Sequence, residues 1–161
     1  MNNSLDQSLG DVKDGGADAC YLTFFNNHLI TAGYGKGRIG VYPLDTAGRI
    51  MPACQIVDFS SEGGVSRLHM ARVLTAPQTG NNYLLVTDKG CDRVYSLRIT
   101  EEENGLRLSR CDSAYISVPK GYGPRHMGHP SCSCGQSTMG HTLGGSPAFL
   151  LLQATFPAVT P

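Results

Sequence analysis

The sequence predicts an all-β fold, a partial β-propeller of about two to two and a half four-stranded antiparallel blades. Three observations support this fold class. Residues 26–39 and 81–94 align at a fixed offset of 55, with two Asn, one Leu, one Gly and one Arg in common. Neither copy has apolar residues at the 3.6-residue period of a helix. Twenty glycines among 161 residues also predict frequent turns.

Each copy of the repeat has the pattern of a β-hairpin, because a short apolar strand precedes a glycine-containing turn and a strand of alternating residues. All-β repeats of about 40–50 residues are typical of propeller blades. A third blade would begin near Arg125. A closed propeller takes about four to eight blades, so we expect this chain to be part of a larger protein. The strands predicted for the first two blades span residues 20–24, 28–33, 38–44, 53–58, 69–74, 83–88, 93–99 and 113–118.

The charged residues are unevenly distributed and divide the chain. Thirteen Lys and Arg balance thirteen Asp and Glu, and all of them lie at or before Arg125. A net charge of zero offers no basic surplus for a nucleic-acid backbone or an anionic membrane, so neither partner is expected. We divide the chain into a flexible segment at 1–18, a partial propeller at 19–130, and an uncharged tail at 131–161 that we expect to be disordered.

The cellular compartment is predicted from the N-terminus and from the apolar runs. The first residues lack the apolar core of a secretory signal. The longest apolar run, 148–152, is far shorter than the roughly 20 residues that cross a bilayer. We therefore expect a cytoplasmic protein. Its six scattered cysteines are not expected to form a disulfide framework in that compartment.

Residues 35–40, Gly-Lys-Gly-Arg-Ile-Gly, match the GxGxxG pattern of dinucleotide-binding loops. That function requires a helix after the loop, so that the helix N-terminus meets the pyrophosphate. Here a strand ending at Pro43 is predicted to follow, and the second copy of the repeat lacks the pattern. We therefore interpret the segment as a hairpin turn and expect no nucleotide cofactor.

A group of thiol and imidazole side chains near the start of the uncharged tail raises the question of a zinc site. The spacing Cys-x-Cys differs from the usual Cys-x2-4-Cys, and few strand or helix signals surround it. No metal is expected. The residues concerned are His126, His129, Cys132, Cys134 and His141.

His69 and His126 lie 57 residues apart, about one repeat, and each begins a predicted innermost strand. Because the starts of these strands surround the channel of a propeller, both side chains are expected to face one pocket. Arg125 precedes His126 after a Gly-Tyr-Gly-Pro turn. Histidine acts as a general base near neutral pH, and arginine binds carboxylate or phosphate with two hydrogen bonds. The alternative is a histidine that is hydrogen-bonded to backbone inside a blade.

Several short motifs, taken in this order and at blade spacing, resemble the lactonase family of seven-bladed β-propellers. That family includes the bacterial-type 6-phosphogluconolactonase and the fungal 3-carboxy-cis,cis-muconate lactonizing enzyme. The resemblance runs from about Ala19 to Pro130. Its motifs are Tyr-Gly at 34–35, Ile-Gly-Val-Tyr-Pro-Leu at 39–44, His-Met-Ala at 69–71, Asp-Arg-Val-Tyr at 92–95, Gly-Pro-Arg-His-Met at 123–127 and His-Pro at 129–130.

The resemblance implies a pocket at the mouth of the channel that contains His69, Arg125 and His126 and binds a small anionic lactone. A histidine and a later glutamate would activate water or move a proton, while arginine would hold the anionic group and stabilise the oxyanion. No metal or cofactor is implied. The chain departs from the family where Tyr21 replaces a histidine, and where one residue is missing between Met127 and His129. No Asn-Glu pair follows Pro130, so the sequence offers no candidate for the glutamate.

The expected function is that of a fragment of a sugar-lactone hydrolase, inactive alone. The reaction implied is conversion of 6-phospho-glucono-lactone to 6-phosphogluconate in the pentose phosphate pathway. Two alternatives stay open. The chain could belong to a cycloisomerase that forms a carboxymuconate lactone, or to a non-catalytic propeller that binds partners.

Overall fold

The computed structural model describes residues 18–61, 64–77, 79–127, 141–143 and 146–148. Every regular element in these residues is a β-strand, and none of them contains a helix that could cross a membrane. The strands are β1 (Ala19–Phe25), β2 (His28–Gly33), β3 (Arg38–Pro43), β4 (Gln55–Asp58), β5 (Leu68–Thr75), β6 (Asn82–Asp88), β7 (Arg93–Glu102), β8 (Gly105–Ser117), β9 (His141–Leu143) and β10 (Ser146–Ala148).

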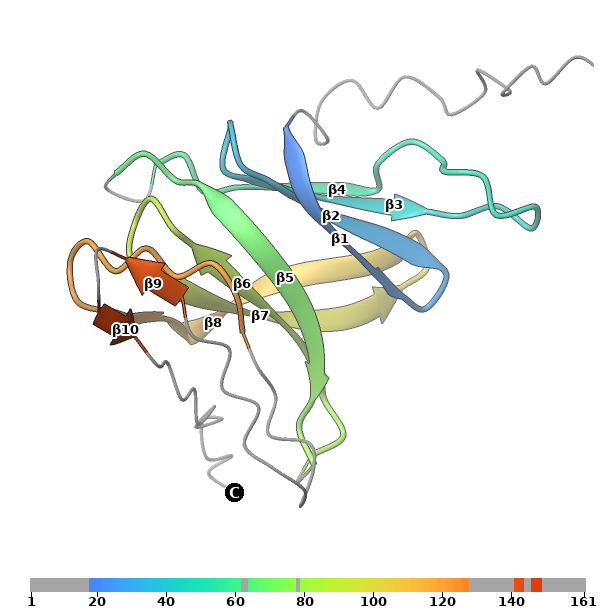
Figure 1. Ribbon diagram of the computed structural model, residues 1–161. Coiled ribbons are helices and arrows are strands. Elements are labelled where there is room, and N and C mark those ends of the chain that lie inside the picture. Colours follow the sequence, from blue (N-terminus) through green and yellow to red (C-terminus); the bar gives the residue numbers. More distant parts are fainter. Residues whose placement is uncertain (1–17, 62–63, 78, 128–140, 144–145, 149–161) are drawn as a thin grey trace, which may run out of the picture.

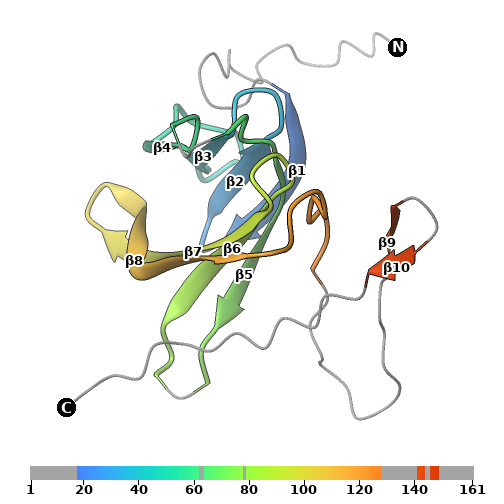
Figure 2. The ribbon, with the colours of Figure 1, turned by 90° about the vertical axis from the view of Figure 1, so that its left-hand side faces the viewer.

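The first eight strands form two four-stranded antiparallel sheets, each in chain order. The first sheet contains β1 to β4 and the second contains β5 to β8. Strand β1 contacts β5, and β4 contacts β8, so the sheets are stacked with corresponding edges together. Figure 1 shows this stacking, and Figure 2 shows it from the side. The predicted all-β class with propeller-type blades is confirmed.

The two-residue turn between β1 and β2 follows directly from its sequence. Asn26 and Asn27 have φ values of 41° and 58°. Asparagine tolerates this left-handed conformation better than most residues, and two such residues match the twist of a two-residue hairpin. The side chain of Asn27 also donates a hydrogen bond to the Leu44 carbonyl at 2.7 Å.

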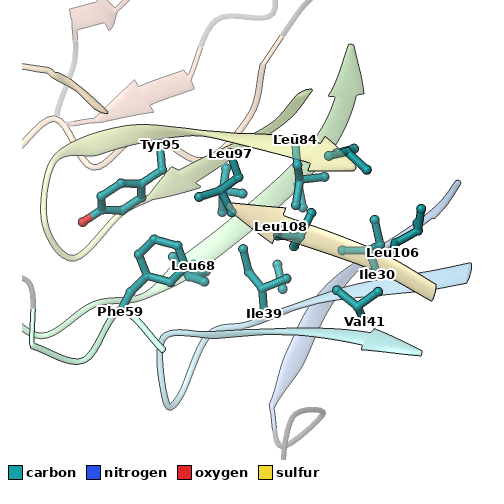
Figure 3. Close-up of a cluster of buried hydrophobic side chains, with 14 residues drawn as sticks. Ile30, Ile39, Val41, Phe59, Leu68, Leu84, Tyr95, Leu97, Leu106 and Leu108 are labelled. Atoms are coloured by element: carbon teal, nitrogen blue, oxygen red, sulfur yellow. The ribbon is translucent and has the colours of Figure 1, made fainter. Parts of the chain in front are cut away.

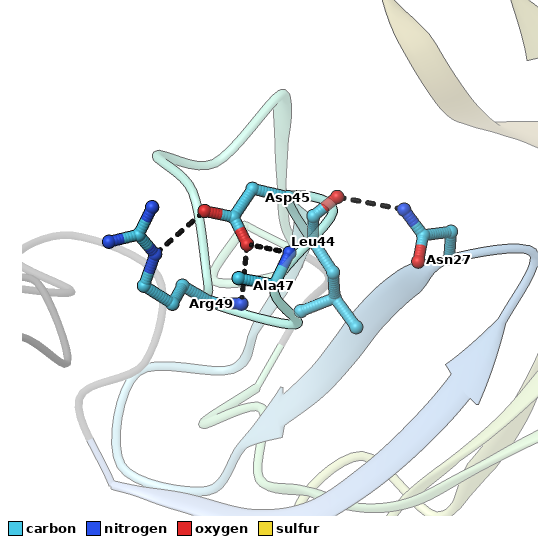
Figure 4. A network of polar contacts seen from close by, with 5 residues as sticks. All are labelled: Asn27, Leu44, Asp45, Ala47 and Arg49. Carbon is cyan, nitrogen blue, oxygen red and sulfur yellow. Dashed lines mark hydrogen bonds and ion pairs between the residues drawn. The ribbon is translucent and has the colours of Figure 1, made fainter.

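The β3–β4 loop is fixed by one aspartate at the same end of the sheet. An oxygen of Asp45 accepts hydrogen bonds from the amides of Ala47, at 2.9 Å, and Arg49, at 2.8 Å. The guanidinium of Arg49 pairs with the other oxygen at 2.7 Å (Figure 4). The hydrogen bond from the Arg49 amide is the main cause of a lowered pKa of Asp45. The loop is therefore ordered far from the ends where β1 and β5 begin.

The hydrophobic core lies between the two sheets and takes side chains from both (Figure 3). Phe59, just after β4, packs on Tyr95 of β7 with 4.6 Å between ring centroids. The core side chains that Figure 3 labels are Ile30, Ile39, Val41, Phe59, Leu68, Leu84, Tyr95, Leu97, Leu106 and Leu108. Each sheet therefore buries one face against the other, as adjacent propeller blades do.

The seven predicted strands up to β7 occur within a few residues of their predicted bounds, but the last hairpin differs. The predicted strands leave residues 105–112 unassigned, whereas β8 begins at Gly105 and pairs with an extended β7. Residues 100–104 are mostly polar, so the apolar pattern that predicts a strand stops before this hairpin. Leu106 and Leu108 alternate into the core and so stabilise the extension. The short hairpin of β9 and β10 was also not predicted.

Polar contacts fix the extended β7–β8 hairpin to the first sheet. The Gln55 side chain donates to the Leu108 carbonyl at 2.9 Å and accepts from the Leu108 amide at 2.7 Å. His28 accepts from the Leu106 amide through Nε2 at 3.3 Å, and its Nδ1 lies 2.6 Å from the Asn26 carbonyl. These partners require a neutral imidazole with its proton on Nδ1. Side chains of the first sheet thus form hydrogen bonds with β8, the edge strand of the second sheet.

Candidate functional site

The antiparallel order places five chain segments at one end of the stacked sheets, which we call the site end. Strands β1 and β5 begin there, and the β2–β3 and β6–β7 turns lie there. The segment 118–127, which follows β8, also starts from this end. The predicted residues His69, Arg125 and His126 all lie in these segments.

His69 lies in a β-bulge. The pairing of β5 with β6 shifts between Leu68, opposite Asp88, and Ala71, opposite Val86. His69 and Met70 therefore share one opposing residue. Bulges redirect side chains and often occur beside active sites. The bulge gives the half-buried His69 a direction that a regular strand would not give it.

The shared opposing residue, Thr87, connects the bulge to the segment that carries Arg125. Its hydroxyl is fully buried, accepts a hydrogen bond from the Met70 amide and donates one to the Arg125 carbonyl, both at 3.0 Å. The Met127 amide lies 3.1 Å from the sulfur of Met70. Residues 125–127 are therefore held against the start of β5.

This arrangement brings the two predicted histidines together. The rings of His69 and His126 lie edge to face, with centroids 5.0 Å apart and planes at 80°. His126 is exposed, whereas Arg125 is half-buried. The Nε of Arg125 is buried, and no described residue accepts a hydrogen bond from it. A buried guanidinium N–H in that state suits an anionic ligand.

Two aspartates of the β6–β7 turn shape the loops around the histidines. Asp88 is fully buried, and its carboxylate orders both its own turn and the segment before β5. It accepts four hydrogen bonds, from the Ser66 hydroxyl and the amides of Arg67, Gly90 and Cys91. We regard Asp88 as a positioning residue because it acts through the backbone around it.

Asp92 orders the loop that follows β8 and precedes Arg125. Its carboxylate accepts hydrogen bonds from the amides of Gly121, at 2.8 Å, and Gly123, at 2.7 Å. Both glycines have positive φ, 85° and 52°, which a residue with a Cβ adopts at a cost. The turn before Arg125 is thus fixed by one side chain, which makes Asp92 a second positioning residue.

Three further residues at the site end were not predicted from the sequence to belong to the site, and they are Tyr34, Arg67 and Lys89. Tyr34 lies edge to face with His69, with ring centroids 6.2 Å apart. Tyr34 and Lys89 occupy equivalent positions of the repeat, since they are 55 residues apart. That offset could have identified both as turn residues at the end where His69 begins its strand.

Two residues at the start of β1 have structural contacts at the site end. Tyr21, at the position where the resemblance calls for histidine, packs against the core. The adjacent Cys20 thiol donates to the carbonyls of Leu68, at 3.3 Å, and His69, at 3.4 Å. Burial raises the pKa of this thiol, so it remains protonated near neutral pH. Cys20 therefore ties the start of β1 to β5 and is unsuited to act as a nucleophile.

The structure describes the possible nucleotide-binding loop in full but only part of the possible metal site. Residues 34–37 form the turn between β2 and β3, and no helix follows, which confirms the hairpin interpretation. Within the described ranges, no group of three potential metal-ligating side chains occurs. His129, Cys132 and Cys134 lie outside those ranges.

Comparisons with known proteins agree with this geometry. A family model described as Lactonase, 7-bladed beta-propeller, matches residues 2–132. The chain belongs to this lactonase family. The match begins earlier than the motifs, which start near Ala19. No curated protein sequence matches the chain.

Solved structures of longer lactonase-type proteins share the fold. A Bacteroides fragilis protein provisionally assigned as a 6-phosphogluconolactonase has 30% identity and a TM-score of 0.57, covering 69% of this chain and 33% of its own. The periplasmic gluconolactonase of Pseudomonas aeruginosa has 27% identity and a TM-score of 0.56, covering 67% of this chain and 31% of its own. This lactonase chain therefore spans about a third of the length of these structures.

Proposed function

We propose that this chain supplies part of the active site of a sugar-lactone hydrolase that converts 6-phospho-glucono-lactone to 6-phosphogluconate, a step of the pentose phosphate pathway. The observation that carries the proposal is the contact between His69 and His126 beside the buried Nε of Arg125, which donates to no described residue. Membership of the lactonase family supports the reaction class. The name of the Bacteroides fragilis neighbour supports the phosphorylated substrate.

The proposed residues suit the chemistry of ester hydrolysis. A water oxygen attacks the lactone carbonyl while an imidazole of the pair takes a proton from that water. The Arg125 guanidinium stabilises the negative charge that develops on the carbonyl oxygen. The bond between the carbonyl carbon and the ring oxygen then breaks, and the imidazolium returns its proton to that oxygen. The exposed His126 is the more accessible base, and His69 lies against it.

The substrate assignment is tested by turnover in a longer protein that contains these blades. We expect it to hydrolyse 6-phospho-glucono-lactone faster than the uncatalysed reaction. Loss of a general base or of an oxyanion donor should each lower kcat by about a hundredfold or more, in His126→Ala and Arg125→Gln. Arg98→Gln, at the opposite end, removes the same charge and should leave the rate unchanged. Preferential turnover of a carboxymuconate would instead favour cycloisomerisation, and partner capture without turnover an interaction module.

We further propose that the 161-residue chain is inactive alone, because it spans only about a third of its solved relatives. The purified chain should hydrolyse the lactone no faster than buffer. Hydrolysis by this chain above the buffer rate, abolished in His69→Ala, would contradict this proposal.

The proposed compartment is the cytoplasm. Cys20 and Cys54 form no disulfide with another described residue, which suits a reducing compartment. The Pseudomonas aeruginosa neighbour is a periplasmic protein, so the two locations need to be separated by experiment. Fractionation of cells that express the gene, followed by immunodetection, should place the protein in the cytoplasmic fraction.

A further inference from the structure

Two cationic side chains contact one aromatic ring at the site end. The guanidinium carbon of Arg67 lies 5.2 Å from the centroid of the Tyr34 ring, and the Lys89 ammonium lies 5.8 Å from it. The same ammonium donates a hydrogen bond to the Tyr34 hydroxyl at 3.3 Å. All three residues are half-buried. The contacts hold two positive charges at one place in a chain whose net charge is zero.

No described carboxylate forms an ion pair with either cation. Asp88 is the acidic residue between them in the fold, yet its oxygens accept hydrogen bonds from backbone amides and from Ser66. Two like charges that share one aromatic ring repel each other, and a bound anion would offset that repulsion.

The pair is continuous with the candidate catalytic residues. Tyr34 lies against His69, and His69 lies against His126. The Lys89 side chain runs along Gly123, where an added Cβ would lie 3.0 Å from its Cγ. Lys89, in the β6–β7 turn, therefore contacts both Tyr34 of the first sheet and the turn that precedes Arg125.

There is open space beside the pair. Gly35 and Ser66, the neighbours of Tyr34 and Arg67 in the chain, line an open pocket of about 340 Å³. Lys36 lines the same pocket and adds a third positive charge. Arg67, Lys89 and the histidines do not line this pocket, which borders the chain segments next to Tyr34 and Arg67 and gives an anionic ligand an approach to them from solvent.

We propose that Arg67 and Lys89, held against Tyr34, bind the phosphate group of a phosphorylated sugar lactone and so distinguish it from the unphosphorylated sugar lactone. The inference rests on the proposed function and names the residues that select its substrate. The solved relatives make the distinction meaningful, since one is assigned as a 6-phosphogluconolactonase and another is a gluconolactonase. Phosphate is the stronger partner for two adjacent cations because it carries more negative charge than the rest of the sugar acid.

The test compares two stable products, 6-phosphogluconate and gluconate, in titrations of the chain followed by NMR or calorimetry. We expect the chain to bind 6-phosphogluconate more tightly than gluconate. Arg67→Gln and Lys89→Gln should each weaken binding of 6-phosphogluconate by about tenfold or more. Neither variant should change the affinity for gluconate. Arg67→Lys keeps the charge and should lose less affinity than Arg67→Gln.

Lys120→Gln is the matched control, since Lys120 is an exposed cation in the loop after β8. It should leave both affinities unchanged. Equal affinity for the two products, or equal loss of affinity in Lys120→Gln and Lys89→Gln, would overturn the proposal. Melting temperatures of all variants, compared with the control, separate loss of a ligand contact from loss of folding.

The proposed phosphate subsite and the proposed hydrolase function can be refuted independently of each other. A longer protein that hydrolyses both lactones equally would retain the function and refute the phosphate subsite. Phosphate-dependent binding that needs Arg67 and Lys89, without any lactone turnover, would refute the hydrolase and retain the subsite.

Discussion

The side-chain hydroxyl of Thr87 donates a hydrogen bond to the backbone carbonyl of Arg125, with 3.0 Å between the two oxygens. The same hydroxyl accepts from the amide of Met70, inside the bulge that carries His69. One buried hydroxyl thus joins the two strand starts that supply the candidate catalytic residues. The contact between His69 and His126 follows from this connection.

Thr87→Val should disturb the site, because valine keeps the shape of threonine and removes the hydroxyl. The Met70 amide and the Arg125 carbonyl would each lose a partner, which costs about 1–3 kcal/mol of unfolding free energy. We also expect the NMR signals of the His69 and His126 rings to shift. Thr87→Ser keeps the hydroxyl and should restore those signals.

Thr31→Val is the control for that substitution. Thr31 is also buried, but no described residue forms a hydrogen bond with its hydroxyl. Replacing the hydroxyl with a methyl group should therefore leave the unfolding free energy unchanged or raise it by about 1 kcal/mol. Identical effects of the two valine substitutions on the histidine signals would show that Thr87 has no positioning role.

Asp92→Asn should loosen the turn before Arg125. An amide offers one carbonyl oxygen, so Gly121 and Gly123 can no longer both find an acceptor on this side chain. We expect faster hydrogen exchange at these two glycines and weaker binding of 6-phosphogluconate. Asp45→Asn keeps one oxygen for the amides of Ala47 and Arg49, loses the ion pair with the Arg49 guanidinium at the opposite end, and should leave that binding unchanged. Unchanged exchange at both glycines in Asp92→Asn would argue against the positioning role.

Leu108→Ala should destabilise the fold strongly, because Leu108 anchors the extended β8 in the core. Removal of a buried leucine side chain costs about 2–5 kcal/mol. The control in the same strand is Ile116→Ala, at an exposed position, where the change should stay within about 0.5 kcal/mol. Urea unfolding of the three proteins measures both effects. Equal midpoints would mean that the extension contributes nothing to the core.

Acid should destabilise the protein in part through Asp58. Hydrogen bonds from Ser60 and the Arg38 guanidinium lower its pKa from 3.8 to about 2. The unfolded chain therefore binds a proton more readily than the folded one between these values. The stabilisation is complete above about pH 4 and is lost as the pH falls through about 2.

Asp58→Asn removes this titrating group. The unfolding free energy of the variant should fall less steeply than that of the original chain between about pH 4 and pH 2. Chemical unfolding at a series of pH values measures the slope. Parallel curves for the two proteins would show that Asp58 titrates alike in both states.

Local patterns in the sequence were sufficient to predict most of the strands. Alternating apolar residues, the Asn26–Asn27 turn and the offset of 55 residues fixed the hairpins because their contacts are between neighbours in the chain. The predicted grouping of His69 with His126 also follows from the repeat, since equivalent strand starts lie at one end of adjacent blades. The roles of these residues stay predictions.

Other features depended on contacts between distant residues. Strand β8 is extended because Gln55 and His28 of the first sheet bind its edge and the core accepts Leu108. Lys89 and Arg67 meet at Tyr34 because two turns from different sheets lie side by side. Such pairs leave no periodic signal, since nothing in the local chain records which side chain will lie opposite another.

The sequence by itself determined the all-β class, the blade repeat and the three candidate catalytic residues, because these depend on local period and order. Tertiary structure alone decided that Thr87 connects His69 to Arg125 and that two cations gather beside them. The physical reason is the short range of hydrogen bonds and cation–π contacts. They form only after the core has brought the two sheets together.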